Sequence, residues 1–352
     1  MKHRMQLAAL AALLVLGACA PVPEHRAGFF VFGTLVEVIV RDVSAEQAQE
    51  AFAEVQRTLQ SMHRDWHAWE PGPLTEINHQ FAAGRAAAAP EDIIELLQLS
   101  QDMETRTGGR FNAAAGGLVS LWGFHTSEFP VTAPAPPESA IETWLASSPS
   151  THDIKVQGRF LQSANPSTQL DFGGIAKGYA VDRIITLLAE RDITQVMVNA
   201  GGDLRAVGAS PAAPWRVGVR APGKGVVAGI EIDDAAAVFT SGVDQRFRER
   251  DGQRYPHILD PRSGRPVQGL ASVTVVAAQG WLADAAATAL MVAGPGEWAE
   301  LAAGLGLDQV LVIDDAGGYH ATPAMAGRLQ WADGLRGDIE LNVVEPTGPN
   351  SP

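Results

Sequence analysis

The chain has 352 residues, of which 46% are hydrophobic and 19% are charged, a balance typical of a globular protein rather than a disordered one. Its formal net charge of −14 argues against a nucleic-acid partner, because binding to a phosphate backbone needs a basic face. The length suits one large domain or two closely joined ones.

The N-terminus reads as an export and anchoring segment. A basic start precedes an apolar run from Leu7 to Leu16, which is too short to span a bilayer. Cys19 follows small residues and is the only cysteine of the chain, so it forms no internal disulfide. We expect residues 1–18 to be a signal peptide and residues 19–27 to be a tether.

Cys19 in this position resembles the lipidated cysteine of a bacterial lipoprotein. The alternative is cleavage nearby, with Cys19 as a spectator thiol. Lipidation would hold the protein on the periplasmic or outer face of a bacterial membrane, and the sequence leaves open whether that is the inner or the outer membrane.

Two helices and a strand are predicted in the first third of the chain. Residues 34–40 are β-branched and compact, which indicates a strand. Ser44 and Gln47 form the pattern of a capping box, and apolar residues recur at helical spacing up to Met62. A second helix is predicted over Pro90–Thr107, stopped by two glycines.

Two segments of this region are candidate ligand contacts. Trp66 and Trp69 lie beside a loop rich in proline and glycine, where they either stack on a planar ligand or pack against the protein. His67 between them is more typical of a structural histidine than of a ligand. The small residues of 110–118 would let a flat ligand lie on the backbone, although the signal is weak alone.

The most informative stretch is Asp171–Ile184, which reads DFGGIAKGYAVDRI. Glycines allow a ligand to approach the backbone, and the following apolar pattern predicts a helix. Helix-start N–H groups favour anions, and Lys177 adds a point charge beside them. Alone, the stretch is equally typical of a glycine-rich turn with a surface lysine.

A second binding edge is predicted where the strand Gln195–Val198 runs into Asn199-Ala200-Gly201-Gly202-Asp203. By contrast, residues 218–224 match only the bare spacing of a P-loop. Gly225 replaces the required Ser or Thr and a β-type run follows, so this segment is predicted to be a hairpin turn.

The last third carries a predicted metal pair and a candidate histidine. His257 lies among turn residues, which favours a functional role. Residues 283–290 are helical in pattern, so Asp284 and Thr288 lie on one face. Their oxygens suit Mg²⁺, although a surface Asp with a packed Thr is the plain alternative. Residues 310–318 predict a final hairpin, and residues 342–352 predict a flexible tail.

In this order the motifs resemble those of the ApbE family of FAD:protein FMN transferases, over nearly the whole mature chain. The motifs are Gly33-Thr34, DFGGIAKGYAVDRI from Asp171, NAGGD from Asn199, TSG from Thr240, HILDP from His257 and ADAAATAL from Ala283.

The resemblance implies an α/β (α+β) fold of the ApbE type, a two-lobed single domain over residues 28–341 with FAD in a cleft between the lobes. It also implies Mg²⁺-dependent transfer of FMN from FAD to a Ser or Thr hydroxyl of an acceptor flavoprotein. The new bond is a phosphoester, and AMP is released.

The resemblance also assigns roles. It implies Mg²⁺ bound by Asp284, Thr288 and a backbone carbonyl near Gly174, with Asp171 and Lys177 close to the flavin nucleotide. His257, Ser241 and Gly242 would line the phosphate and adenosine side, supported by Asn199 and Asp203. His257 is the candidate general base, with Asp284 as its competitor.

Three segments depart from the family pattern. Phe32 replaces a common methionine, Ala68-Trp69 replaces a Ser/Thr-Tyr pair, and Asn112-Ala113-Ala114 replaces Asp-Pro-Thr. Phe32, Trp69 and the Asn112–Ala114 segment are therefore expected at the FAD site with altered contacts.

Three other functions remain compatible with the residues. The same site would support FAD pyrophosphatase activity, in which water cuts FAD to FMN and AMP. A non-catalytic FAD-binding periplasmic lipoprotein is a second alternative, against which the intact Asp284/Thr288 pair argues. A solute-binding lipoprotein is the third, and it would not need that pair.

Overall fold

The computed structural model describes residues 23–345, except 210–212, 245, 251–252 and 335–338. The predicted signal peptide of residues 1–18 and the predicted lipidation site Cys19 lie outside the described residues. Within the described part of the chain, no helix is long and apolar enough to cross a bilayer.

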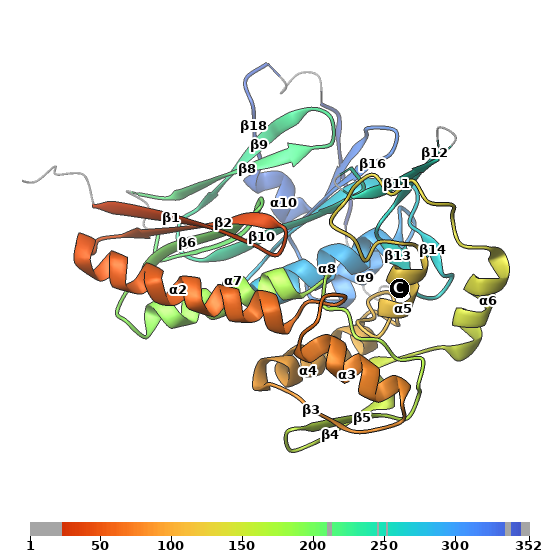
Figure 1. Ribbon diagram of the computed structural model, residues 1–352. Helices are drawn as coiled ribbons and strands as arrows, with labels where there is room; N and C mark the ends of the chain where they lie inside the picture. The colour runs from red at the N-terminus through yellow and green to blue at the C-terminus, as the bar shows by residue number, and fades with distance from the viewer. Residues whose placement is uncertain (1–22, 210–212, 245, 251–252, 335–338, 346–352) are drawn as a thin grey trace, which may run out of the picture.

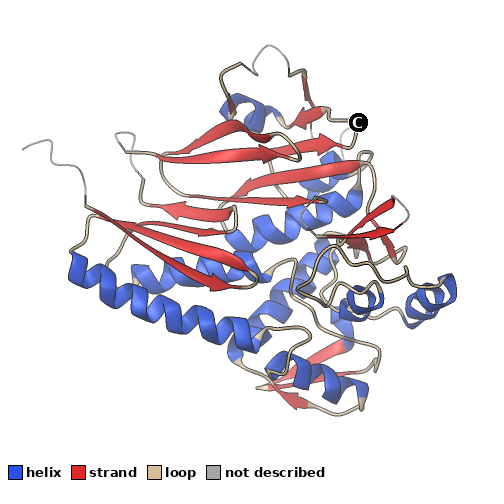
Figure 2. Cartoon of the chain, turned by 45° about the horizontal axis from the view of Figure 1, so that its top comes forward, coloured by secondary structure: helices blue, strands red, loops and turns tan. Residues whose placement is uncertain are grey.

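A large sheet forms the centre of the molecule (Figures 1 and 2). Its neighbouring strands are antiparallel, except that β17 and β19 are parallel. In spatial order, the strands found in the described residues are β1 (Glu24–Val31), β2 (Thr34–Arg41), β6 (Gln195–Ala200), β7 (Asp203–Val207), β10 (Ala236–Gly242), β15 (Leu270–Ala277), β16 (Val310–Asp314), β17 (Tyr319–Ala321) and β19 (Leu341–Val343).

Both ends of the domain extend further than the sequence predicted. Residues 24–27 of the predicted tether belong to β1, which pairs with β2 along its whole length. Residues 342 and 343 of the predicted tail belong to β19, which pairs with β17. Pairing with strands already in the sheet orders these polar segments, and no local periodicity signals such pairing.

Three helices cover one face of the sheet: α2 (Ala45–Asp65), α7 (Ala176–Ala189) and α8 (Gly280–Ala293) (Figures 1 and 2). α2 begins as predicted, with Ser44 Oγ accepting from Gln47 N at 3.1 Å. The reciprocal half of the capping box is replaced, because the Gln47 side chain donates to the Arg191 carbonyl. Alternating valines of β2 pack into this layer.

The other face carries a second apolar cluster beneath a small sheet of β8 (Trp215–Ala221), β9 (Gly225–Ile232) and β18 (Gln330–Trp331), with α10 (Pro323–Arg328). β8 and β9 form a hairpin across residues 218–224, which confirms that this segment is not a P-loop. β16 and β17 form the predicted late hairpin, although α10, β18 and β19 follow it.

The remaining elements pack beside one end of the helical layer (Figure 1). α4 matches the predicted second helix, whereas α3 and α5 were not predicted, because proline and small residues at their starts resemble a loop. These elements are α3 (Pro73–Ala82), α4 (Glu91–Arg106), α5 (Gly116–Leu121), α6 (Glu138–Ser147), α9 (Trp298–Gly304), β3 (Ala87–Ala88), β4 (Ile154–Gln157), β5 (Phe160–Ser163), β11 (Phe247–Arg250), β12 (Gln253–Pro256), β13 (Leu259–Asp260) and β14 (Arg265–Pro266).

Candidate functional site

Lys177 lies in the first turn of α7, and its ammonium group is shared by two carboxylates. Nζ lies 3.2 Å from Asp284 Oδ1 on α8 and 3.1 Å from Asp203 Oδ2 at the start of β7. Burial alone would lower the pKa of Lys177, but the two carboxylates outweigh burial and raise the pKa above its ordinary value. Lys177 therefore stays charged at neutral pH.

The second oxygen of Asp284 accepts from the backbone N–H of Gly178 at 2.9 Å. That N–H belongs to the first turn of α7, so Asp284 occupies part of the helix start that the sequence suggested for an external anion. Burial raises the pKa of Asp284, and the nearby Lys177 opposes this shift. Both oxygens of the carboxylate thus have a partner from α7.

Asp284 reaches α7 because the two helices cross with their main chains in contact. A Cβ on Gly178 would lie 2.2 Å from the Gly280 carbonyl oxygen, and one on Gly280 would lie 2.6 Å from the Gly178 carbonyl oxygen. Asp182 secures the crossing, since its carboxylate accepts from the N–H groups of Gly280 and Trp281 at 2.9 and 3.0 Å.

A group of oxygen atoms lies next to Asp284. Thr288 is one turn further along α8, and its Oγ1 lies 3.2 Å from Ser241 Oγ at the end of β10. Gly174 faces the same hydroxyl, because a Cβ on Gly174 would lie 3.4 Å from Thr288 Oγ1. The structure therefore brings Gly174 and Ser241 to Thr288, one helical turn from Asp284.

This donor set fits a hard divalent cation. Mg²⁺ prefers oxygen ligands and keeps several waters, so one carboxylate with hydroxyl and backbone oxygens suits it. Among the described residues, no group of three or more His, Cys, Asp or Glu side chains is placed to hold a metal ion. A site made of protein carboxylates and imidazoles alone is thus not formed by this part of the chain.

Asp171 lies at the entry to the glycine loop rather than against Lys177. Its Oδ1 accepts from Gly173 N at 2.8 Å, and its Oδ2 lies 3.1 Å from Nε2 of His125. Burial would raise the pKa of Asp171, but the contact with His125, the Gly173 N–H and the charge of Arg246 together outweigh burial and lower the pKa. The backbone of Asp171 donates to the Ala113 carbonyl at 2.8 Å.

His257 follows β12, and its ring nitrogen Nδ1 lies 3.1 Å from the Arg246 carbonyl oxygen. A carbonyl only accepts, so Nδ1 carries the proton in this contact and Nε2 is the basic nitrogen of the neutral ring. Burial, followed by the charge of Arg246, lowers the pKa of His257 to about 4. The charges of Lys177 and Asp171 also act on this ring.

The predicted aromatic contacts already stack on protein rings. Phe32, at the tip of the β1–β2 hairpin, stacks on Trp66 with ring centroids 6.0 Å apart. Trp69 stacks on His125 with centroids 5.1 Å apart, and His67 meets Trp69 edge-on at 4.4 Å. One face of each predicted flavin-contacting ring is therefore covered within the protein.

Other predicted site residues shape the surrounding turns. Asn112 donates to the Pro149 carbonyl at 2.9 Å and accepts from Ala114 N at 2.8 Å, while the side chains of Ala113 and Ala114 are buried. Asn199 accepts from Gly202 N at 2.8 Å, which closes the β6–β7 turn.

Gly242 ends β10 opposite Ser272. It therefore lies next to Ser241, at the same end of the strand as the oxygen group described above.

Sequence reasoning missed His125, Arg246 and the close contact of Gly178 with Gly280. His125 follows Trp122-Gly123-Phe124 without any informative spacing, and its partner Asp171 is 46 residues away in the chain. Arg246 carries the carbonyl that holds His257, and its Nη2 would lie 3.4 Å from a Cβ on Gly33. For the contact of Gly178 with Gly280, the only signal in the sequence was the glycines of Asp171–Ile184, which indicate a close backbone approach.

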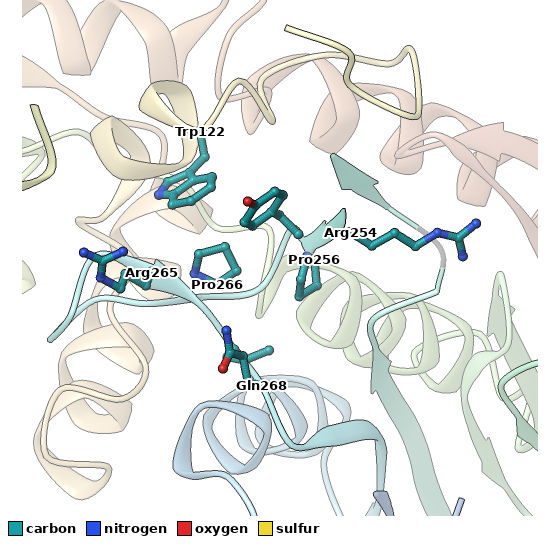
Figure 3. A pocket seen from close by; sticks show the side chains of 8 residues that line it. Trp122, Arg254, Pro256, Arg265, Pro266 and Gln268 are labelled. Atoms are coloured by element: carbon teal, nitrogen blue, oxygen red, sulfur yellow. The ribbon is translucent and has the colours of Figure 1, made fainter. Parts of the chain in front are cut away.

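Two cavities lie near these residues. One of about 310 Å³ adjoins His125 and is lined by Ala68, Trp69, Pro71, Gly72, Thr75, Glu76, Asn78, His79, Ser120, His125 and Gln169. Another of about 260 Å³, seen in Figure 3, is lined by Trp122, Arg254, Tyr255, Pro256, Arg265, Pro266, Val267 and Gln268. Lys177 lines neither of them.

The sequence matches known proteins over most of its length. The model of the ApbE family matches residues 32–311. A FAD:protein FMN transferase of Rhodobacter capsulatus is 41% identical over 93% of this chain, which spans 63% of the length of that relative. A FAD:protein FMN transferase of Klebsiella pneumoniae is 30% identical, with 82% of this chain and 83% of the relative covered.

Solved structures give the same result for the fold. The ApbE protein of Thermotoga maritima is 26% identical with a TM-score of 0.78, and the match covers 87% of this chain and 99% of the other. The flavin transferase ApbE of Vibrio cholerae is 26% identical with a TM-score of 0.76, covering 88% of this chain and 100% of the other. The predicted mixed α/β single-domain fold is thereby confirmed.

Proposed function

This chain belongs to the ApbE family, and from that premise we propose that it transfers FMN from FAD to a Ser or Thr hydroxyl of an acceptor flavoprotein. The observation that carries the proposal is the meeting of Lys177 with Asp284 and Asp203 beside the glycine loop. A partly exposed ammonium group balanced by two acids, next to hydroxyl oxygens, is suited to binding a charged diphosphate with a metal ion.

The reaction is a phosphoryl-group substitution. The acceptor hydroxyl oxygen forms a bond to the phosphorus of the FMN half, the bond between the two phosphates breaks, and AMP leaves with the bridging oxygen. The hydroxyl proton needs a base. Nε2 of His257 is our candidate because it is unprotonated at neutral pH, and Asp284 remains its competitor.

We propose that Asp284, Thr288 and the Gly174 carbonyl bind Mg²⁺. The bound ion would neutralise charge on the diphosphate and polarise the phosphorus under attack. Ser241 lies against Thr288 and Lys177 against Asp284, so these two side chains orient the donors from either side. Asn199 closes the β6–β7 turn, and Gly242 ends β10 next to Ser241.

The proposed flavin contacts are Phe32, Trp69 and the segment of Asn112, Ala113 and Ala114, with Asp171 at the loop entry. Their support is the motif order of the family. Because Phe32 and Trp69 stack on protein rings, each offers a flavin at most its other face.

We further propose that Cys19 carries a lipid that anchors the protein to the periplasmic side of a bacterial membrane. The support is the sequence around Cys19 alone.

Replacement of Asp284 tests the proposal. Asp284→Ala, assayed with MgCl2, FAD and a candidate acceptor flavoprotein, is expected to lower covalent flavin on the acceptor at least about 100-fold, because the metal and Lys177 both lose a partner. FAD binding, followed by flavin fluorescence, should persist in part. EDTA added to the wild type should reproduce the loss.

Asp314→Ala is the matched control, because Asp314 is a carboxylate of the remote β16–β17 hairpin. Unchanged transfer in Asp284→Ala would refute the metal assignment. FMN and AMP formed from FAD alone, with no flavin on any acceptor, would favour the pyrophosphatase instead.

A further inference from the structure

His125 makes a contact that the proposed chemistry does not use directly. Its Nε2 lies 3.1 Å from Asp171 Oδ2, and the two side chains are only 15% and 14% exposed. Gly173 N occupies the other carboxylate oxygen at 2.8 Å. A largely buried carboxylate with one partner on each oxygen has a fixed orientation, and losing either partner leaves an unpaired oxygen.

Asp171 begins the loop that builds the proposed site. Gly174 lies three residues after Asp171, and a Cβ added to it would contact both Phe111 at 3.2 Å and Thr288 at 3.4 Å. Ile175 is the N-cap of α7, which presents Lys177 and the Gly178 N–H to Asp284. The orientation of Asp171 is thus transmitted to both sides of the oxygen group within one short segment.

His125 is also held by contacts with residues outside the glycine loop. Its ring stacks on Trp69 with an interplanar angle of 20°. The preceding turn is also secured, since buried Arg248 donates from Nε to the Trp122 carbonyl at 3.1 Å. These contacts do not involve the glycine loop, so His125 is a fixed point against which the loop can be aligned.

A third contact holds Leu170, the residue that precedes Asp171. Asn78 of α3 pairs with Leu170 in both directions, donating to its carbonyl at 3.0 Å and accepting from its N–H at 2.7 Å. Asn78 fixes the backbone one residue before Asp171, whereas His125 contacts the carboxylate oxygen of Asp171 that Gly173 does not bind.

We propose that His125 is a positioning residue for FMN transfer, acting through Asp171 to hold the segment 172–177 where Gly174 and Lys177 meet Asp284 and Thr288. The effect on rate rests on the proposed function, whereas the effect on loop order does not.

The test compares His125→Ala and His125→Gln with the wild type. Misplacement of reacting groups costs roughly 10–100-fold in rate, so we expect kcat for transfer to fall by that factor in His125→Ala, with KM for the acceptor changed less than about threefold. The amide of His125→Gln can donate to Asp171, so this variant should recover to within about fivefold of wild type.

His320→Ala is the matched control. His320 Nε2 lies 2.8 Å from Asp314 Oδ2, so the variant removes an equivalent His–Asp contact far from the glycine loop. Its kcat should equal that of the wild type within about twofold. Equal losses in His125→Ala and His320→Ala would overturn the proposal.

Hydrogen exchange supplies a readout independent of activity. Peptides covering residues 171–178 should exchange at least about fivefold faster in His125→Ala and at the wild-type rate in His125→Gln, without any ligand present. If the wild type transfers no FMN, this measurement still decides the positioning role. Unchanged exchange together with unchanged kcat would refute it.

A double-mutant cycle tests whether His125 acts through Asp171. Adding His125→Ala to Asp171→Ala should lower kcat less than about twofold further, because the contact is already gone. Fully multiplicative losses would show that His125 acts by another route. Should His125→Ala fail to fold, His125→Leu keeps apolar volume without the donor and takes its place in every measurement.

Discussion

Lys177 and His257 face the proposed site in opposite protonation states. Two carboxylates outweigh burial and keep the pKa of Lys177 above its ordinary value, whereas burial and Arg246 lower that of His257 to about 4. At neutral pH the chain therefore offers a cation to phosphate oxygens and a neutral imidazole to a hydroxyl proton. Such a separation of titrating groups assigns distinct acid–base roles to neighbouring side chains.

The shift of His257 predicts an unusual pH profile. If its Nε2 is the base, kcat/KM for transfer should stay flat from pH 8 down through 6.5 and fall only as the pH approaches about 4. The same assay on His257→Gln should give a rate roughly 10²–10⁴-fold lower, without that acid limb. An acid limb that survives in His257→Gln would assign the base elsewhere, with Asp284 as the next candidate.

The same shift has a consequence for stability, with a definite sign. The folded pKa of about 4 lies below the unfolded value of 6.5, so the unfolded chain binds more protons between them. The stabilisation that comes from neutral His257 is fully present above pH 6.5 and is lost as the pH falls through the folded pKa of about 4. Urea titrations at pH 7 and pH 5 measure this effect. The difference in the free energy of unfolding between the two pH values should be smaller in His257→Gln than in the wild type.

At the scale of elements, the crossing of α7 and α8 determines the site. Gly178→Ala should destabilise the protein by about 1–3 kcal/mol, because the new methyl would overlap the Gly280 carbonyl and push the helices apart. Transfer should fall by more than the unfolded fraction explains, since Asp284 loses its place at the helix start. Urea unfolding and transfer rate measure the two effects.

Gly304→Ala is the control for this prediction. Gly304 ends α9 with no atom within 4 Å of an added Cβ, so alanine should leave stability unchanged or raise it by up to about 1 kcal/mol. A Gly178→Ala protein as stable and active as Gly304→Ala would show that the helices tolerate a wider spacing.

Periodicity predicted the elements whose residues themselves carry the pattern. α2 shows its apolar stripe and its Ser44 cap, and the four-residue spacing of Asp284 and Thr288 placed both on one face of α8. β19 was hidden because its three residues are ordered by pairing with β17, which lies elsewhere in the chain.

The same distinction separates the predicted from the unpredicted parts of the site. The glycine loop and the metal pair could be read as motifs, whereas the contacts of Lys177 with Asp203 and of Asp171 with His125 join residues far apart in sequence. Without the fold, nothing indicates which carboxylate Lys177 meets. The order of the six motifs indicated the family, because residues far apart in the chain are brought together only by that fold.

At the scale of the molecule, apolar clusters pack on both faces of the sheet, and the proposed site lies at the ends of its central strands. The end of β6, the start of β7 and the end of β10 meet there, which places Asp203 against Lys177 of α7 and Ser241 against Thr288 of α8. The site thus draws on the ends of several elements rather than on one loop.

The proposed anchor also acts on the whole molecule. Because β1 already begins at Glu24, a lipid on Cys19 would leave the folded domain close to the bilayer surface. Cys19→Ser, expressed in a Gram-negative host, should move the protein from the membrane to the soluble periplasmic fraction and abolish labelling with a palmitate analogue. Transfer by the purified variant should be unchanged. Continued membrane retention of an unlabelled Cys19→Ser protein would contradict the proposed anchor.

The contact between Gly178 and Gly280 has a consequence for how the site tolerates change. A side chain can adopt another rotamer, but two main chains in contact cannot. The spacing between α7 and α8, and with it the distance from the Asp284 carboxylate to the Gly178 N–H, is therefore set by the backbone. Replacement of Phe32 or Trp69 should therefore alter the proposed flavin contact while leaving the contacts of Asp284 with α7 intact.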